Sequence, residues 1–305
     1  MERIKQALEK AREDRLRAGM PASLEPRSAT TPVTQISYSQ TNTQQVKHDL
    51  LREQRIITGN EKDAAVDAYK ILRTQVLQRL NENNWNTLAV TSPGDSEGKT
   101  LTAINLGIAL AQEVTYTVLL VDVNLRRPSV HTHFGLTPEK GLSDYLTGNI
   151  SLSSLLIHPA GIERFVVLPG GAPLANSSEM LNSPKMKQLV EELKERYRSR
   201  IILFDLPPLL TSSDALAFAP YVDAFLMVVE EGKSPASEVQ RAAELLTHTH
   251  LLGTVLNKSQ QFIHTGVDSE EWLGRAGQTL ANNKFLHTAW EKARRLMNRL
   301  RKGKS

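Results

Sequence analysis

Residues 91–100 read Thr-Ser-Pro-Gly-Asp-Ser-Glu-Gly-Lys-Thr, the residue types and spacing of a loop that binds phosphate. A short apolar run precedes them and a helical pattern follows, so a strand leads through a glycine-containing turn into a helix. Backbone N–H groups in such a turn point inward at an anion, and the helix N-terminus adds the positive end of its dipole. Lys99 can then reach the outer phosphates of a nucleotide, and the Thr100 hydroxyl can hold Mg²⁺. Pro93 stands where the first glycine of the usual spacing is expected, and Gly94 follows it.

Two further apolar runs end in a carboxylate. Asp122 follows the run 118–121, and Asp205 follows the run 201–204 and precedes two prolines. A Mg²⁺ ion that bridges nucleotide phosphates takes one or two carboxylates beside the hydroxyl of the loop. A single Asp after a strand is usually a turn former, but two of them together with a phosphate-binding loop favour a metal–nucleotide site. We expect Asp214, by contrast, to cap the helix that follows it.

These residues need a scaffold that brings the ends of several strands together. Short apolar runs that fit buried strands occur at 88–90, 118–121, 165–168, 201–204, 225–229 and 252–256. Helical patterns occur between them, at 101–113, 184–197 and 234–247. This alternation predicts an α/β fold with a doubly wound, mostly parallel sheet that is covered by helices on both faces. Ligands bind such sheets at the carboxyl ends of the strands.

The composition is typical of a globular chain. Its 305 residues are 40% hydrophobic and 23% charged, enough for one full α/β domain with extensions. Cysteine is absent, which excludes disulfides and thiolate metal sites. No run of about 18 uncharged apolar residues occurs, so we expect no transmembrane helix. The charged N-terminus excludes a secretory signal.

Composition also suggests how the chain is divided. Residues 1–19 have the pattern of a short helix, either a docking element or a solvated charged helix. Residues 20–58 are rich in Ser, Thr, Gln and Pro, and we expect a flexible linker there. The P-loop domain should occupy residues 59–260. Residues 261–305 form a tail.

The tail holds most of the positive charge. Residues 284–305 contain eight Lys or Arg and one Glu, a net charge of +7, although the whole chain carries only +4. Apolar residues recur there at steps of three and four, which predicts a basic amphipathic helix. We rank an anionic membrane surface or a membrane partner first as its target, packing against the domain second, and nucleic acid last.

The order of the motifs carries a more specific likeness. The chain contains, in sequence, PxxxxGKT, VLLVDxNLRRP, LPGG…NSSEML, IILFDLPP…SDA, VDAFLMVVEEG and GTVLNK. This order resembles the bacterial tyrosine kinase (BY-kinase) family, in particular its stand-alone autokinases of exopolysaccharide loci. The resemblance covers residues 55–260 and implies a P-loop NTPase fold related to the partitioning and septum-placement ATPases. It also implies ATP and Mg²⁺ as cofactors and transfer of the γ-phosphate to tyrosine.

The resemblance assigns the site. It makes Lys99, Asp122 and Asp205 catalytic, and it makes Thr100, Asp122 and Asp205 the Mg²⁺ site. In it, Asp122 also activates the tyrosine hydroxyl and Asp205 acts on the metal through water. The base would lie beside Asn257. The full set of residues that would bind the nucleotide is Gly94, Asp95, Ser96, Glu97, Gly98, Lys99, Thr100, Leu101 and Asn257.

The resemblance also implies partners. Members of the family close a ring of subunits with a charged helix, and the corresponding series here is Asp67, Lys70 and Arg73. A solvated helix face with i, i+3 ion pairs is the alternative. A separate membrane protein of the polysaccharide co-polymerase type would act as activator. We therefore expect a cytoplasmic protein that is peripheral at the inner face of the cell membrane.

Three departures from the family pattern keep other functions open. Asn124 stands where a second Asp is usual, Leu206 stands where a small hydroxyl residue is common, and no tyrosine follows Tyr221. Tyr38 is the one tyrosine in the predicted linker, which makes it the candidate for self-phosphorylation. The alternatives are a non-kinase ATPase switch of the partitioning or septum-placement type and a scaffold that senses nucleotide without turnover. The basic tail favours the switch, but Gly94 occupies the position of its signature lysine.

Overall fold

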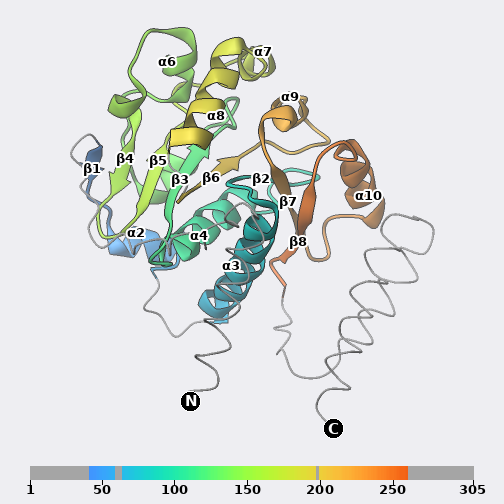
Figure 1. The fold of residues 1–305 in the computed structure, drawn as a ribbon. Coiled ribbons are helices and arrows are strands. Elements are labelled where there is room, and N and C mark those ends of the chain that lie inside the picture. Colours follow the sequence, from blue (N-terminus) through green and yellow to red (C-terminus); the bar gives the residue numbers. More distant parts are fainter. Residues whose placement is uncertain (1–40, 59–63, 197–198, 260–305) are drawn as a thin grey trace, which may run out of the picture. The chain divides into compact units, whose positions relative to one another are not determined.

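The computed structural model describes residues 41–58, 64–196 and 199–259. The predicted N-terminal helix, most of the predicted linker and the tail lie outside the described residues. The described part holds one eight-stranded sheet in the order β1-β4-β5-β3-β6-β2-β7-β8 (Figure 1). The strands are β1 (Asn42–Gln44), β2 (Thr87–Thr91), β3 (Thr117–Asp122), β4 (Ile157–Pro159), β5 (Phe165–Leu168), β6 (Arg200–Asp205), β7 (Ala224–Glu230) and β8 (Leu251–Asn257).

Every neighbouring pair in the sheet is parallel except β4 and β5. The connecting α-helices are α2 (His48–Glu53), α3 (Ala64–Asn83), α4 (Lys99–Ala111), α5 (Val130–Phe134), α6 (Leu142–Thr147), α7 (Ser177–Leu181), α8 (Pro184–Arg196), α9 (Asp214–Phe218) and α10 (Ala236–Leu245). Two short 3₁₀ helices, η1 (Leu152–Leu155) and η2 (Ala219–Tyr221), complete the set. The predicted doubly wound, mostly parallel sheet is confirmed.

Each face of the sheet has its own core, because side chains alternate along a strand. In β3, Leu120 packs into the cluster that α3 and α4 cover, whereas Leu119 and Val121 pack into the opposite cluster with α8, α9 and α10. The central strands are buried on both faces, which explains why they are near-continuous apolar runs. Polar chemistry on these strands is therefore confined to their ends.

The structure differs from the predicted linker at residues 41–58. β1 pairs in parallel with β4, and Leu51, Ile56 and Ile57 are 1%, 2% and 5% exposed within the core under α4. Buried Asn105 on α4 accepts a hydrogen bond from the Ile57 N–H at 3.0 Å and donates to the Arg55 carbonyl at 3.0 Å. The linker prediction is wrong for this segment because its few apolar residues cluster at one end, where an average over residues 20–58 conceals them.

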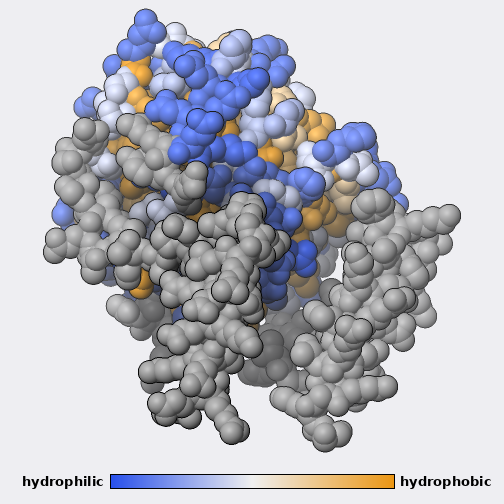
Figure 2. Space-filling model, in the orientation of Figure 1, coloured by the Kyte–Doolittle hydropathy of each residue, from blue (hydrophilic) through white to orange (hydrophobic). Residues whose placement is uncertain are grey.

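The described surface is mainly hydrophilic on the face in Figure 2. Large hydrophobic side chains that are at least 40% exposed lie on separate elements, namely Ile71, Val114, Leu245 and Leu256. Scattered apolar residues of this kind are normal on protein surfaces and mark no interface by themselves. Among the described residues, no helix is both long and apolar enough to span a membrane.

Candidate active site

The predicted catalytic and metal-binding residues meet at the carboxyl ends of β2, β3 and β6, which are neighbours in the sheet. Asp122 at the end of β3 is in register with Asp205 at the end of β6, and Val90 of β2 is in register with Asp205 on its other side. Residues 93–100, which we call the P-loop, join β2 to α4. The Thr100 hydroxyl donates a 2.7 Å hydrogen bond to Asp205 Oδ2. Loop hydroxyl and strand-end carboxylate are thus in direct contact.

The backbone of the P-loop takes a conformation that few side chains permit. Gly98 has φ +91°, and a Cβ there would lie 2.1 Å from Asn257 Nδ2, so the position requires glycine. Ser96 also lies in the left-handed region, with φ +64°. For a residue with a side chain this conformation costs about 1–2 kcal/mol. The loop must therefore be held by its neighbours.

Asp122 is fully buried and organises the segment that follows it. Its Oδ2 accepts hydrogen bonds from the backbone N–H groups of Ser129 at 2.8 Å and Val130 at 3.0 Å, and its Oδ1 accepts one from Asn124 at 3.2 Å. These bonds fold residues 123–130 back over the carboxylate. Burial, together with the charge of Asp205, raises the pKa of Asp122 to about 7. A carboxyl with such a pKa can exchange a proton near neutral pH.

Asp205 is the other half of the pair. Burial raises its pKa above the ordinary value, and Lys99 and the Thr100 hydroxyl counter the rise in part. Its Oδ1 is buried and has no hydrogen-bond partner among the described residues. An orphaned carboxylate oxygen beside a hydroxyl and a second carboxylate fits Mg²⁺ with its water shell. Within residues 41–58, 64–196 and 199–259, no three His, Asp or Glu side chains gather as a metal site.

Other predicted nucleotide ligands lie in different environments. The side-chain amide of Asn257 contacts the P-loop itself, because it donates to the Glu97 carbonyl at 2.9 Å. Leu101 packs against the core, so only its backbone can face the loop. The Glu97 carboxylate accepts from the Gly94 N–H at 3.2 Å and braces the loop from within. The Lys99 ammonium lies close enough to Asp205 to lower the pKa of that carboxyl.

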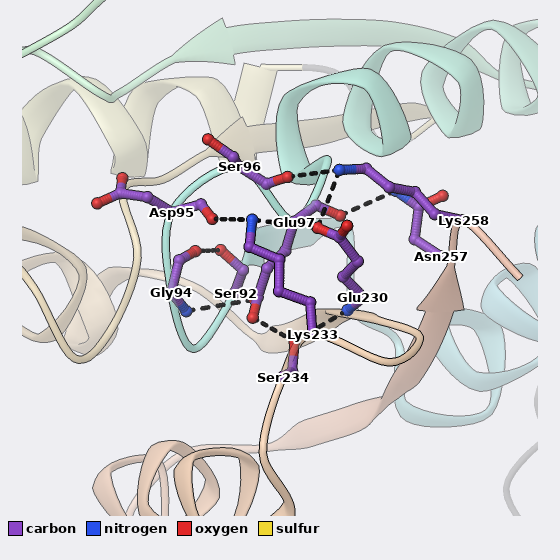
Figure 3. A network of polar contacts seen from close by, with 10 residues as sticks. All are labelled: Ser92, Gly94, Asp95, Ser96, Glu97, Glu230, Lys233, Ser234, Asn257 and Lys258. Carbon is purple, nitrogen blue, oxygen red and sulfur yellow. Dashed lines mark hydrogen bonds and ion pairs between the residues drawn. The ribbon is translucent and has the colours of Figure 1, made fainter.

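Sequence reasoning missed the residues that grip the P-loop from outside (Figure 3). Lys258 donates to the Ser96 carbonyl at 2.8 Å, and Lys233 donates to the Asp95 carbonyl at 3.2 Å. Ser234 donates to the Glu97 carboxylate. These residues follow β7 and β8, whose pairing places them beside the loop. The available signal was a group of polar residues at the ends of two apolar strands: Lys258 lies inside a motif already noted, and Lys233 and Ser234 directly follow another.

The predicted cap role of Asp214 is wrong. Asp214 is the first residue of α9 and is fully buried, and its carboxylate accepts hydrogen bonds from Ser177 Oγ at 2.5 Å and Arg126 Nε at 3.3 Å. It therefore joins the segment after β3, which carries Arg126, to the segment after β6. The Asp214 carboxylate pairs with a residue distant in the sequence and does not cap its own helix. The N-cap residue of α9 is Ser213.

The charged series on α3 lies away from the site. Lys70 and Asp67 form an exposed i, i+3 ion pair of 3.1 Å, which is the alternative that the spacing left open. Arg73 instead points inward, pairing with Glu113 at 3.0 Å and donating to the Ala109 carbonyl at the end of α4. Two of the three predicted contact residues are thus available on the surface, and the third is engaged within the chain.

A glycine-bent loop between a central strand and a helix, its hydroxyl bonded to one strand-end carboxylate with a second carboxylate adjacent, defines a P-loop nucleotide-binding domain. No family model matches the sequence. The chain is 32% identical over 204 residues to the tyrosine-protein kinase Etk of Escherichia coli K12, covering 66% of this chain and 28% of Etk. It is 30% identical over 201 residues to the tyrosine-protein kinase YwqD of Bacillus subtilis 168, covering 65% of this chain and 83% of YwqD. The chain belongs to the bacterial tyrosine-protein kinase family.

Solved structures agree with this membership. The kinase domain of the E. coli tyrosine kinase Etk superposes with a TM-score of 0.63 at 29% identity, covering 74% of this chain and 92% of that domain. The chain therefore matches the kinase part of Etk and a little over a quarter of the length of the whole Etk protein. The septum site-determining protein MinD of Pyrococcus horikoshii, solved with Mg-ADP, has a TM-score of 0.51 at 21% identity and shares the fold alone.

Proposed function

We propose that this chain is an ATP-dependent protein-tyrosine kinase that regulates exopolysaccharide synthesis, polymerisation or export together with a separate membrane partner. The observation that carries the proposal is the contact of Thr100 with Asp205, beside Asp122, at the end of a P-loop strand. Family membership supports tyrosine as acceptor. The membrane activator of the polysaccharide co-polymerase type comes from the family resemblance.

The chain's own residues suggest the division of labour. The N–H groups of the P-loop and the Lys99 ammonium would orient the phosphates of ATP. Thr100, Asp122 and Asp205 would hold Mg²⁺, which when bound neutralises charge on the transferring phosphoryl group. The tyrosine oxygen attacks the γ-phosphorus, the bond from that phosphorus to the β–γ bridging oxygen breaks, and ADP leaves. The Asp122 carboxylate would accept the proton of the tyrosine hydroxyl.

A non-kinase ATPase switch remains the second candidate. The basic tail favours it. Gly94 counts against it, because the resemblance places the signature lysine of those ATPases at this position.

Location and assembly belong to the same proposal. The tail, which lies outside the described residues, would hold the protein at the anionic inner face of the membrane. Co-sedimentation with phosphatidylserine vesicles tests this, and equal sedimentation after deletion of residues 284–305 would contradict it. Self-association would use the exposed Asp67 and Lys70 of α3.

Phosphosite mass spectrometry after incubation with Mg-ATP tests the kinase function. We expect phosphotyrosine in the wild-type protein, with Tyr38 as the first candidate, and none in Lys99→Met, because the outer phosphates lose their ammonium partner. Lys187→Met is the matched control, since the Lys187 side chain is exposed and pairs with Glu191 on the surface. ATP turnover without phosphotyrosine, also with the activator's cytoplasmic segment present, would favour the switch instead.

A further inference from the structure

Three consecutive carbonyl groups of the P-loop are bonded from outside the loop. The Lys233 ammonium donates a hydrogen bond to the Asp95 carbonyl, and the Lys258 ammonium donates one to the Ser96 carbonyl. The Glu97 carbonyl is bonded by the Asn257 amide. The donors come from the ends of β7 and β8, two paired strands in which Glu230 is in register with Asn257. One edge of the sheet therefore grips the outer side of the phosphate-binding loop (Figure 3).

One carboxylate joins the two lysines. Glu230 Oε2 accepts from Lys258 at 2.9 Å and from Lys233 at 3.3 Å, and the Glu230 side chain is 15% exposed. The hydrogen bond from Lys258, supported by Lys233, holds the pKa of Glu230 below its ordinary value, so the group is charged at neutral pH. The carboxylate fixes where the two ammonium groups sit and balances their charge. We call Glu230, Lys233 and Lys258 the clasp.

The geometry of a trans peptide links the clasp to phosphate binding. In each planar peptide unit the C=O and the N–H of the next residue point in opposite directions. When the carbonyls of residues 95, 96 and 97 are drawn outward, the N–H groups of Ser96, Glu97 and Gly98 face the other side of the loop. Inward N–H groups are what a phosphate-binding loop offers its ligand.

The clasp also holds the strained residue of the loop. Ser96 keeps a left-handed backbone although it carries a side chain, and it is the Ser96 carbonyl that Lys258 binds. Without Lys258, the peptide group between Ser96 and Glu97 loses the hydrogen bond that fixes its orientation. The orientation of the loop's N–H groups would then vary, and the binding of phosphate would weaken.

We propose that Glu230, Lys233 and Lys258 are positioning residues that set nucleotide affinity through the backbone of the P-loop, without touching the nucleotide. The inference rests on the proposed function only in that the P-loop binds a nucleotide. The alternative is that the lysines act as plain positive charges near the phosphates. The two explanations predict opposite changes in nucleotide affinity when the Glu230 carboxylate is removed.

Glu230→Gln is the decisive variant, measured in the full chain by calorimetric titration with Mg²⁺ and AMP-PNP. If the lysines act as charges, removing a nearby carboxylate strengthens binding. If the clasp positions the loop, the same change weakens binding by about fivefold to tenfold, the size of one ordinary hydrogen bond, because Gln keeps an acceptor oxygen but loses the charge. Glu238→Gln is the control, because it makes the same change in net charge at an exposed position on α10.

Lys258→Met provides a second, independent test of the clasp. We expect about tenfold weaker binding of AMP-PNP and faster hydrogen exchange at the amides of residues 96–98, with an unchanged melting temperature. Stronger or unchanged binding in Glu230→Gln would overturn the clasp, whatever the affinity of Lys258→Met. A wild-type protein that binds AMP-PNP but forms no phosphotyrosine would overturn the kinase function and leave the clasp in place. A wild-type protein that binds no nucleotide would overturn both.

Discussion

Asp122 and Asp205 are two buried carboxyl groups that face each other across a strand pair. The pKa of Asp122 is raised to about 7, so the folded protein keeps a proton that the unfolded chain releases near its ordinary value of 3.8. Stability from this proton is complete below the unfolded value and is lost as the pH rises through the folded value. The nucleotide-free protein is therefore least stabilised by this pair at the upper end of the neutral range.

The measurement is the melting temperature of the nucleotide-free protein between about pH 5 and pH 8, where we expect it to fall as the pH rises. Asp205→Asn removes the neighbouring charge and keeps an oxygen for the Thr100 hydroxyl, so its profile should be flatter. Asp223→Asn is the contrasting control, because burial raises the pKa of Asp223 but hydrogen bonds from Lys194, Thr87 and the backbone outweigh it and leave the pKa below its ordinary value. Parallel profiles for wild type and Asp205→Asn would contradict the coupling.

The ion pair of Arg126 and Asp214 is asymmetric. The Arg126 side chain is 48% exposed, whereas that of Asp214 is 0% exposed. Arg126→Met leaves a buried carboxylate without its cation and should lower the free energy of unfolding by about 2–4 kcal/mol. Asp214→Asn lets the guanidinium return to water and should cost only about 1 kcal/mol. Urea unfolding measures the free energy of unfolding of both variants. Equal decreases would contradict the argument that the burial of Asp214 makes the loss of Arg126 more costly.

At the scale of elements, Asn105 attaches the segment before α3 to the body of the domain. Its side chain satisfies the Ile57 N–H and the Arg55 carbonyl, both at 3.0 Å. Asn105→Leu leaves these backbone groups unpaired, so we expect a loss of about 2–3 kcal/mol and faster proteolysis within residues 41–58. Asn81→Leu is the control, because Asn81 makes an exposed bond to Tyr116. Equal cleavage in both variants would show that Asn105 does not hold the segment.

Prediction from sequence succeeded where local pattern and tertiary structure agree. β2, β3 and β6 are apolar runs that end at the site, so the neighbourhood of Thr100, Asp122 and Asp205 could be predicted. β1 and β4 have three residues each, too few for a period to appear. Asp214 could serve as a cap or as an ion-pair partner, and only the distant Arg126 and Ser177 decide between them. The clasp depends on the pairing of β7 with β8, which no local pattern encodes.

At the scale of the whole molecule, α3 carries two kinds of charged residue: one that makes contacts within the chain, and one that is exposed and available to a second copy of the chain. Arg73 and Glu113 are 18% and 39% exposed, whereas Lys70 and Asp67 are 45% and 76% exposed. Arg73→Ala should therefore lower the stability of the single chain by about 1–2 kcal/mol. The double variant Asp67→Ala, Lys70→Ala should change it by less than about 0.5 kcal/mol.

The same two variants test self-association by sedimentation velocity. If Asp67 and Lys70 contribute to a contact between copies, the double variant sediments as smaller species than the wild type while its melting temperature is retained. An unchanged distribution would remove this pair from the proposed interface.

The bonds that shape the P-loop span almost the whole domain: Glu97 and Asn257 are 160 positions apart, and Ser96 and Lys258 are 162 apart. A ribosome adds about 5–20 residues each second, so the loop is synthesised roughly ten to thirty seconds before the residues that grip it. During that interval its carbonyl groups lack their final donors. A phosphate-binding loop with all of its supporting donors is therefore a property of the finished domain, and the order of synthesis makes it one of the last features of the domain to be completed.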